Sequence, residues 1–324
     1  MRIVFMGSPD FAIPVLRLLI ESEHEIVAVY TQPDRPVGRG RRLQPPPVKT
    51  LALQHNLDVR QPASISPPEV VEELRQLAPD AGVIAAYGQI LKQPVLDVPR
   101  LGILNVHASL LPRWRGAAPI PAAILAGDAE TGATIMKVVR ALDAGPILES
   151  TVVPILPDDT TARLTPRVAQ AGATLLLDVL PRWEAGTIQA TPQDDALATY
   201  APQLKKSDAL IQWGRDDAET IWRQVRAYNP WPVAHTYDGD QPLRILEAVP
   251  LLTAYDAEPG TVFPITGVAE PYPLDAGFGV VARDSALGIS LVQASGGRPM
   301  RAADFINGHR DLLGRRLTAE PVRN

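Results

Sequence analysis

Cysteine is absent from this chain of 324 residues, and its absence excludes a disulfide framework, a zinc site with thiolate ligands and a cysteine nucleophile. Long hydrophobic runs are absent as well, because no apolar run approaches the roughly 20 residues that a membrane span requires. The apolar start of the chain is interrupted by Gly7, Pro9 and Asp10, which is too early for a signal peptide. These absences favour a soluble, cytoplasmic protein.

Three further motifs are missing, and each would have indicated a different chemistry. Gly7 stands alone after the first strand-like run, so the Gly-x-Gly-x-x-Gly fingerprint of nicotinamide and flavin sites is lacking. No Gly-x-Ser-x-Gly elbow of the serine hydrolases occurs, although Ser109 closely follows a histidine. None of the histidines stands at a zinc-like spacing from another ligand. They are His24, His55, His107, His235 and His309. We therefore expect no metal centre.

The sequence does contain enough apolar residues for a large core, since they make up 46% of a chain long enough for two domains. The pattern begins with a strand at residues 2–7, a helix after Asp10 and a valine-rich strand at residues 25–31. Such a βαβ unit indicates a parallel sheet. A nearly continuous apolar run at residues 80–87 is typical of a central strand. The N-terminal part is therefore predicted to be an α/β domain with a Rossmann-like, mostly parallel sheet.

The C-terminal part has a different pattern, and a polar, poorly periodic connector at residues 184–203 precedes it. We place the domain boundary there, which gives domains at residues 1–203 and 204–324. Apart from one helix at about residues 218–227, the second domain consists of short β-like runs separated by proline and glycine. The runs lie at residues 233–237, 243–248, 260–264, 279–281 and 289–292. Five short strands with frequent turns favour a small β-barrel of the OB type, a fold that commonly binds oligonucleotides.

Charge is unevenly distributed in a chain whose net charge is −5. No acidic residue occurs at residues 35–57, a window that contains Arg35, Arg39, Arg41, Arg42 and Lys49. The segment at residues 32–47 is rich in glycine, proline and arginine, so we expect a long loop without a packed element. It is either a solvated insertion or a loop that orders on a nucleic acid. The tail contains a second basic group, namely Arg298, Arg301, Arg310, Arg315 and Arg316.

The strongest candidate for a catalytic site is the stretch at residues 105–116. A short apolar run leads into it and Pro112 ends the extended part, so Asn105 and His107 are predicted at the carboxyl end of a buried strand. Residues two apart on a strand point the same way, which turns an amide and an imidazole toward one crevice. Asp143, in a polar turn, is the candidate third member. By itself, a histidine at a strand end is more often structural than catalytic.

The order Asn-x-His-x-Ser-Leu-Leu-Pro at residues 105–112, followed by Gly116 and by Leu-Asp-x-Gly around Asp143, closely resembles the signature of the folate-dependent formyltransferases. The resemblance implies 10-formyltetrahydrofolate as formyl donor and no metal. It implies that Asn105, His107 and Asp143 are catalytic. The residues that it implies for folate binding are Ser109, Leu110, Leu111 and Pro112, with Tyr87, Gln89, Ile90 and Leu91 as a wall of the pterin pocket.

Formyl transfer to an amine needs a stabilised formyl oxygen, a proton for the leaving nitrogen and the loss of a proton from the attacking amine. Asn105 can donate its amide N–H to the developing oxyanion. Protonated His107 can add a second donor or deliver the proton. Asp143, if it lies against His107, would orient the imidazole and raise its pKa.

The acceptor is indicated by the rest of the chain. The basic loop, with Arg35, Arg39, Arg41 and Arg42, resembles the acceptor-stem loop of the family members that formylate methionine on initiator tRNA. Similar likenesses cover the segments around residues 205–213, 226–232 and 297–308. The resemblance implies RNA contacts for the arginines of the loop, and Lys205 and Lys206 can reach the acceptor stem or form a solvated linker pair. The alternatives are a formyltransferase for an amino-sugar nucleotide and a non-catalytic RNA-binding protein on the same scaffold.

Two further expectations concern packing and assembly. The run Asn229-Pro230-Trp231-Pro232 is predicted to be a structural turn anchored by a buried tryptophan rather than an RNA contact. The protein is expected to act as a monomer without a membrane partner.

Overall fold

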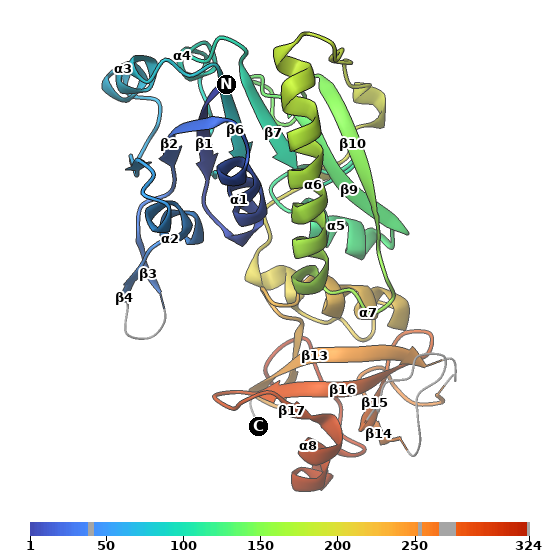
Figure 1. Ribbon diagram of the computed structural model, residues 1–324. Helices are drawn as coiled ribbons and strands as arrows, with labels where there is room; N and C mark the ends of the chain where they lie inside the picture. Colours follow the sequence, from blue (N-terminus) through green and yellow to red (C-terminus); the bar gives the residue numbers. More distant parts are fainter. Residues whose placement is uncertain (38–41, 252–254, 266–276, 323–324) are drawn as a thin grey trace. The chain divides into compact units, whose positions relative to one another are not determined.

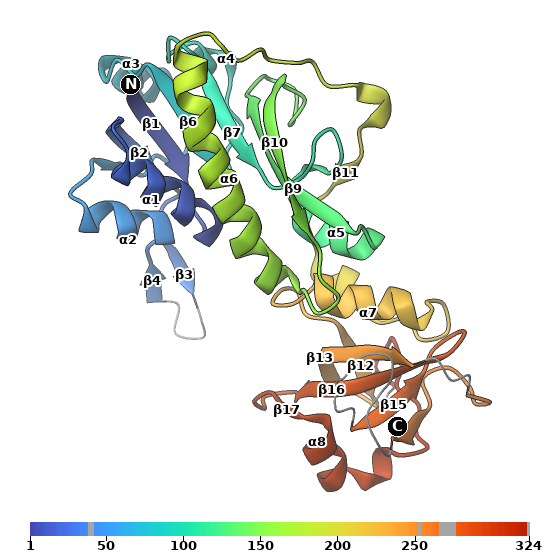
Figure 2. The ribbon, with the colours of Figure 1, turned by 45° about the vertical axis from the view of Figure 1, so that its right-hand side comes forward.

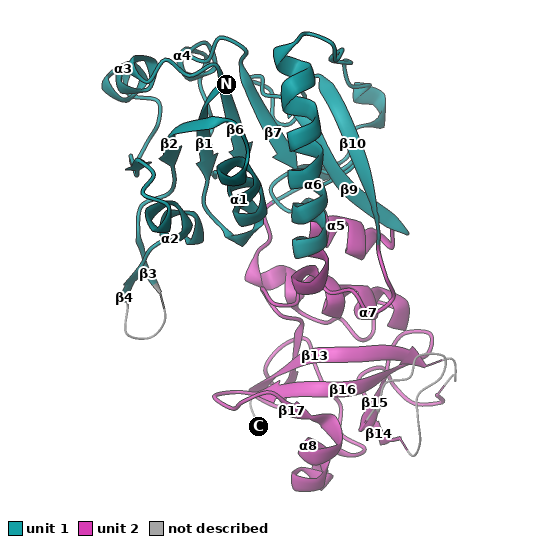
Figure 3. Ribbon diagram, viewed as in Figure 1, with its two compact units in different colours: residues 1–119, 129–154, 165–202 teal, residues 120–128, 155–164, 203–324 magenta. Residues whose placement is uncertain are grey.

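The computed structural model describes residues 1–37, 42–251, 255–265 and 277–322 of the chain (Figure 1). The chain forms two compact units (Figure 3). Unit 1 comprises residues 1–119, 129–154 and 165–202, and unit 2 comprises residues 120–128, 155–164 and 203–324. Each unit has a hydrophobic core cluster of its own. Among the described helices, none combines the length and the apolarity that crossing a bilayer requires.

Unit 1 contains a mixed sheet of seven strands in the order β10-β9-β7-β6-β1-β2-β5. The strands are β1 (Arg2–Gly7), β2 (Glu25–Tyr30), β5 (Val59–Arg60), β6 (Ala81–Ala85), β7 (Ile103–His107), β9 (Glu130–Lys137) and β10 (Ile147–Pro154). The neighbours from β5 to β7 are parallel, whereas β9 and β10 join antiparallel. The predicted α/β domain with a largely parallel sheet is therefore confirmed.

Helices cover both faces of this sheet because successive residues of its strands point to opposite sides. Ile3 and Phe5 of β1 pack in one cluster with α1, α2 and α6, whereas Val4 and Met6 pack in another with α3 and α4. The helices are α1 (Ile13–Glu21), α2 (Pro47–Gln54), α3 (Pro68–Gln76), α4 (Gln93–Leu96) and α6 (Thr161–Glu184). Figures 1 and 2 show α1 and α6 on the same side of the sheet. The strands are thus apolar on both faces, as a doubly covered sheet requires.

The basic segment forms a short antiparallel hairpin of β3 (Arg35–Val37) and β4 (Arg42–Gln44). The expectation of a loop without regular structure is wrong for these residues, because a two-stranded backbone ladder requires no packed side chains. All of β4 is exposed. At the base, Asp34 binds the Lys49 ammonium at 2.9 Å and accepts a hydrogen bond of 2.7 Å from Gln61. Residues 38–41, which include Arg39 and Arg41, lie outside the described residues.

Unit 2 contains a curled antiparallel sheet in the order β12-β13-β16-β15-β14, with β17 added to β16. The strands are β12 (His235–Asp238), β13 (Gln241–Leu251), β14 (Val262–Pro264), β15 (Phe278–Val281), β16 (Ala286–Ala294) and β17 (Met300–Arg301), and the helices are α7 (Ala218–Ala227) and α8 (Ala302–Gly308). Trp222, Ile245 and Phe305 belong to its core. Register shifts around Glu247 mark bulges in β13, which increase the twist of the sheet.

The turn after α7 differs from its prediction, because Trp231 is 50% exposed and does not anchor it. Instead, Asn229 donates from Nδ2 to the Leu246 carbonyl at 3.2 Å and accepts at its own carbonyl from the Ala162 N–H at 3.1 Å. Polar contacts of Asn229 thus hold a turn that was expected to depend on a buried indole.

The remaining elements are short and join the larger ones. They are α5 (Pro119–Ala126), β8 (Arg115–Gly116), β11 (Tyr200–Ala201) and the 3-10 turns η1 (Asp10–Ala12), η2 (Asp195–Leu197), η3 (Lys206–Ala209) and η4 (Arg310–Leu312). In unit 1, β8 pairs with β11, so the connector before residue 203 adds a strand beside the segment that follows β7.

Candidate active site

Strand β7 positions the two candidate residues that the sequence places at its end. Asn105 is partly exposed, whereas the His107 side chain is only 6% exposed. Asn105 stands opposite Ile84 of β6 and Met136 of β9, and His107 stands opposite Thr134. Because the two residues are separated by one position on a strand, they point to the same face of the sheet.

The segment after β7 folds back through hydrogen bonds of its own. Ser109 is fully buried, and its hydroxyl donates to the Arg113 carbonyl at 2.6 Å. The Thr134 hydroxyl donates to the Ser109 carbonyl at 2.7 Å and accepts from the Leu111 N–H at 3.2 Å. The serine hydroxyl is therefore used to close the turn. Thr134 was not identified from the sequence, because its place opposite His107 depends on the register between β7 and β9.

The imidazole of His107 has a different partner on each nitrogen. Nε2 lies 2.9 Å from the Trp114 carbonyl, which can only accept, so this nitrogen carries a proton. Nδ1 lies 3.8 Å from Oδ2 of Asp143, beyond hydrogen-bonding distance but within the range of an ion pair. The structure thus brings His107 and Asp143 together, and it leaves Nδ1 as the nitrogen on the carboxylate side.

Asp143 lies in the turn between β9 and β10 with a positive φ of 46°, and its side chain is 14% exposed. Its Oδ2 accepts a hydrogen bond of 2.8 Å from the Gly116 N–H. Gly116 has a φ of 117°, and a Cβ there would lie 2.7 Å from the Ala201 carbonyl oxygen. Only glycine fits this close approach, which places its N–H against the carboxylate.

Two residues that sequence analysis assigned no role lie behind this turn. Arg115 is 3% exposed and donates to the side chains of Gln193 and Asp195. Gln193 donates in turn to the carbonyls of Asp143 and Gly145, at 2.8 and 2.7 Å. Gln193 belongs to a connector without hydrophobic periodicity, so no pattern in the sequence indicated its position.

The residues implied for folate binding follow the carboxyl ends of β6 and β7, which are neighbours in the sheet. Tyr87 and Leu91 are buried, and burial raises the pKa of the Tyr87 hydroxyl. Ile90 is 83% exposed, which is unusual for a large apolar side chain. The Gln89 amide accepts from the Ile65 N–H and donates to the Pro62 carbonyl. On the second segment, Ser109 and Leu111 are buried, while Leu110 and Pro112 are partly exposed.

Among the residues implied for RNA contact, Arg35 and Arg42 are exposed on the hairpin, and Lys205 and Lys206 are exposed in unit 2. Arg35 donates to Oε1 of Gln32 at 3.2 Å. Gln32 donates from Nε2 to the Tyr87 carbonyl at 3.1 Å. Within unit 1, the basic hairpin is therefore linked by two hydrogen bonds to the segment implied for pterin binding.

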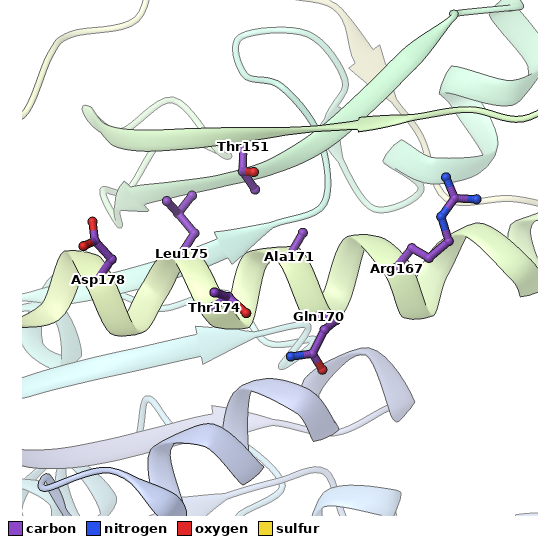
Figure 4. Close-up of a pocket in the computed structure, with 7 residues that line it drawn as sticks. All are labelled: Thr151, Arg167, Gln170, Ala171, Thr174, Leu175 and Asp178. Atoms are coloured by element: carbon purple, nitrogen blue, oxygen red, sulfur yellow. The ribbon is translucent and has the colours of Figure 1, made fainter.

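A groove of about 560 Å³ lies elsewhere in unit 1, between β10 and α6 (Figure 4). Arg167 and Asp178 lie at its two ends, and Ala171 and Leu175 face the strand at Thr151. None of its lining residues is a candidate for catalysis or folate binding. Over the described parts of the chain, no three His, Asp or Glu side chains are grouped as metal ligands.

Comparisons with known proteins give one consistent result. A family model described as formyl transferase matches residues 1–180, and one for the formyl transferase C-terminal domain matches residues 203–310. A methionyl-tRNA formyltransferase of Methylococcus capsulatus is 50% identical over 98% of this chain and 99% of its own length. One of Pseudomonas syringae is 45% identical over 96% of both chains.

A solved structure of the sugar 3N-formyl transferase WlaRD, with dTDP and 5-N-formyl-THF, has a TM-score of 0.64 at 15% identity, over 89% of this chain and 97% of its own. This likeness shows a shared fold, whereas the two sequence relatives share nearly the whole chain at high identity. The chain therefore belongs to the methionyl-tRNA formyltransferase family of formyl transferases.

Proposed function

We propose that this protein transfers the formyl group of 10-formyltetrahydrofolate to the α-amino group of methionine esterified to initiator tRNA. The observation that carries the proposal is the approach of His107 to Asp143 at the end of β7, in a chain that matches a methionyl-tRNA formyltransferase over 98% of its length. In the reaction, a new C–N bond forms between the formyl carbon and the methionyl nitrogen. The bond between that carbon and the folate nitrogen then breaks.

Asn105, His107 and Asp143 are the proposed catalytic residues. Asn105 is partly exposed on the strand face that it shares with His107, so its amide can donate to the formyl oxygen as negative charge develops. The Trp114 carbonyl occupies Nε2 of His107, so Nδ1 is the atom proposed to move protons between the attacking amine and the leaving nitrogen. Asp143, fixed by the Gly116 N–H, lies 3.8 Å from Nδ1 and orients the imidazole.

For the donor, we propose a site between the segments after β6 and β7, with Tyr87, Gln89, Ile90 and Leu91 on one side. The exposure of Ile90 supports this assignment, because a pterin ring would cover an apolar side chain that water otherwise surrounds. The Gln89 side chain contributes by fixing the backbone of Pro62 and Ile65, to which its amide is hydrogen-bonded. The other side is Ser109, Leu110, Leu111 and Pro112, whose hydrogen-bonded turn presents a preformed surface.

For the RNA, we propose that the exposed arginines of the hairpin, Arg35 and Arg42, bind backbone phosphates together with Arg39 and Arg41, which lie outside the described residues. Lys205 and Lys206 are exposed and carry charge of the same sign. Part of the basic tail is already neutralised, since Arg315 and Arg316 form ion pairs with Asp238 and Glu258.

We propose further that the curled sheet of unit 2 acts as an OB-like RNA-binding barrel and that the domain boundary lies between residues 203 and 204. The antiparallel strand order and the exposed Arg298 and Arg301 support the first proposal. The start of the second family match at residue 203 supports the proposed domain boundary. A monomer located in the cytoplasm stays a prediction.

The acceptor is tested by incubating the protein with 10-formyltetrahydrofolate and, separately, charged initiator tRNA, glycinamide ribotide and an amino-sugar nucleotide. We expect formylation of the methionyl-tRNA at a rate far above the other two. Preferential formylation of the amino-sugar nucleotide would contradict the proposal. It would favour the alternative, a sugar formyltransferase such as WlaRD.

A further inference from the structure

Gln193 lies in the connector at residues 184–203, and its side chain binds the turn of Asp143 in the same unit. We propose that Gln193, held by Arg115, is a positioning residue that fixes Asp143 for catalysis, so that the connector is part of the active site. This inference rests on the proposed role of Asp143 in formyl transfer.

The amide of Gln193 uses both of its ends. Nε2 donates to the carbonyls of Asp143 and Gly145 at 2.8 and 2.7 Å, and Oε1 accepts from Nε and Nη2 of Arg115 at 3.0 and 2.8 Å. Carbonyls only accept and a guanidinium only donates, so the reversed amide would face acceptor to acceptor and donor to donor. The chemistry of the partners therefore determines the orientation of this amide.

Arg115 strengthens this arrangement because its charge is buried. Its other side-chain partner in the network is Asp195, at 2.8 Å, which is 83% exposed and therefore screened by water. Oε1 of Gln193 is thus an important partner of the Arg115 guanidinium, whose burial would otherwise cost free energy. A guanidinium bound to the oxygen of an amide polarises that amide and makes its N–H groups better donors.

The turn of Asp143 needs such support. Asp143 has a φ of 46°, a left-handed conformation that a residue other than glycine adopts only where its surroundings impose it. Gly145 is packed so closely that a Cβ would lie 1.7 Å from the Lys137 carbonyl oxygen. Gln193 binds the carbonyls on either side of Ala144, which fixes both ends of the turn at once.

The side chain and the main chain of Asp143 are held by the same strand. Gly116, the residue after Arg115, donates its N–H to the carboxylate, while Arg115 acts on the Asp143 carbonyl through Gln193. Arg115 itself is tied to the connector by its N–H, which donates to the Thr199 carbonyl at 2.9 Å. A shift of Gln193 would therefore move the carboxylate relative to His107 while the strands of the sheet stay in place.

The test is the isosteric variant Gln193→Glu, which retains an acceptor for Arg115 but loses both donors to the turn. We expect kcat for formylation of methionyl-tRNA to fall about 10- to 100-fold, because misplacement of a reacting group by about 1 Å has costs of this size. KM for the donor and for the tRNA should change less than about twofold. Asp195→Ala is the matched control, since it removes only the exposed partner of Arg115, and its kcat should stay near that of the parent.

A purely structural role is separated from positioning by a double-mutant cycle with Asp143→Asn. If Gln193 acts through Asp143, adding Gln193→Glu to Asp143→Asn causes no further loss of kcat. Losses that multiply would overturn the inference. Should the Glu variant not fold, as judged by circular dichroism, Gln193→Ala in the same cycle gives the same two outcomes.

The two levels of the proposal fail in different ways. Full activity of Asp143→Asn would contradict the proposed catalytic role and the inference with it. If Asp143→Asn causes a large loss of kcat while Gln193→Glu has the same kcat as the control Asp195→Ala, only the role of Gln193 is overturned.

Discussion

The strand end that carries His107 and the hairpin that carries Arg42 belong to the same unit but differ in how they are held. His107 is 6% exposed, ends a strand that pairs with β6 and β9, and contacts a carbonyl and a carboxylate. Arg42 is exposed on a two-stranded ribbon outside the main sheet. Transition-state stabilisation requires groups that are already in place, whereas a phosphate can be neutralised by a mobile surface charge.

The difference suggests a division of labour within unit 1. Changes at the strand end should lower kcat and leave the salt dependence of binding intact. Changes at the hairpin should reduce the salt dependence of tRNA binding and leave kcat intact. Two hydrogen bonds, from Arg35 to Gln32 and from Gln32 to the Tyr87 carbonyl, link the hairpin to the segment after β6, the strand that pairs with β7.

The largest effect is expected for His107→Ala. Loss of the imidazole should lower kcat by about 10²- to 10⁴-fold, the range for a general acid or base, with little change in the binding of 10-formyltetrahydrofolate. Steady-state kinetics and a direct binding titration check both parts. His55→Ala, at an exposed histidine, is the control and should retain full activity. Near-normal turnover of His107→Ala would remove the proposed mechanism.

A smaller effect is expected for Gly116→Ala. The new Cβ would meet the Ala201 carbonyl, and the displaced N–H would no longer fix Asp143, so kcat should fall about 10- to 100-fold. Strain at the positive φ should also lower the free energy of unfolding by about 1–3 kcal/mol.

Gly186→Ala is the matched control for that variant, because its φ is also positive, at 66°, but among the described residues no atom beyond its chain neighbours lies within 4 Å of the new Cβ. It should lose stability and keep its kcat. An equal loss of kcat in the two glycine variants, measured beside thermal unfolding, would show that the Gly116 N–H is unimportant for turnover.

Arg42→Ala probes the other side of the comparison. We expect KM for methionyl-tRNA to rise several-fold at constant kcat, and the slope of log binding constant against log salt to fall by about 1. Arg17→Ala, on the exposed side of α1, is the control for the loss of one charge. A fall in kcat with an unchanged salt slope would break the proposed separation of the two regions.

The smallest effect concerns the base of the hairpin. Hydrogen bonds from Gln61 and then Lys49 lower the pKa of Asp34 below its ordinary 3.8. A lowered carboxyl pKa stabilises the folded state above the ordinary value, and this contribution disappears as pH falls through the lowered pKa. Asp34→Asn should therefore be less stable than the parent at pH 7, with the gap closing below about pH 3.8.

Thermal unfolding at a series of pH values measures this gap. Lys49→Met should show part of the same pH dependence, because it removes one of the two partners of the carboxylate. A gap that stays constant down to the lowest pH would show that ionisation of Asp34 does not contribute to holding the hairpin.

The parts of the fold with a clear hydrophobic period could be predicted from the sequence. The apolar runs of β1, β6 and β7 were identified because a strand covered on both faces needs them, and the order of strand and helix indicated their parallel pairing. On β7, a period of two was enough to place Asn105 and His107 on the same face.

What depends on contacts between distant residues could not be predicted. Gln193 meets Asp143 across 50 positions of sequence, from a connector whose composition indicates only a linker. The hairpin at Arg35–Val37 and Arg42–Gln44 was missed because its ladder uses backbone groups and leaves no pattern in the side chains. The burial expected for Trp231 was wrong because Asn229 supplies the anchor.

The most direct test of the account is the rate of formyl transfer to initiator methionyl-tRNA in a single turnover by Asp143→Asn, with donor and tRNA both saturating. The substitution keeps the shape of the side chain that lies 3.8 Å from Nδ1 of His107 and removes its charge. We expect a rate at least about 100-fold below that of the parent protein with unchanged donor affinity. A rate within about threefold of the parent, below the range expected for a group that takes part in the proton transfers, would contradict this expectation.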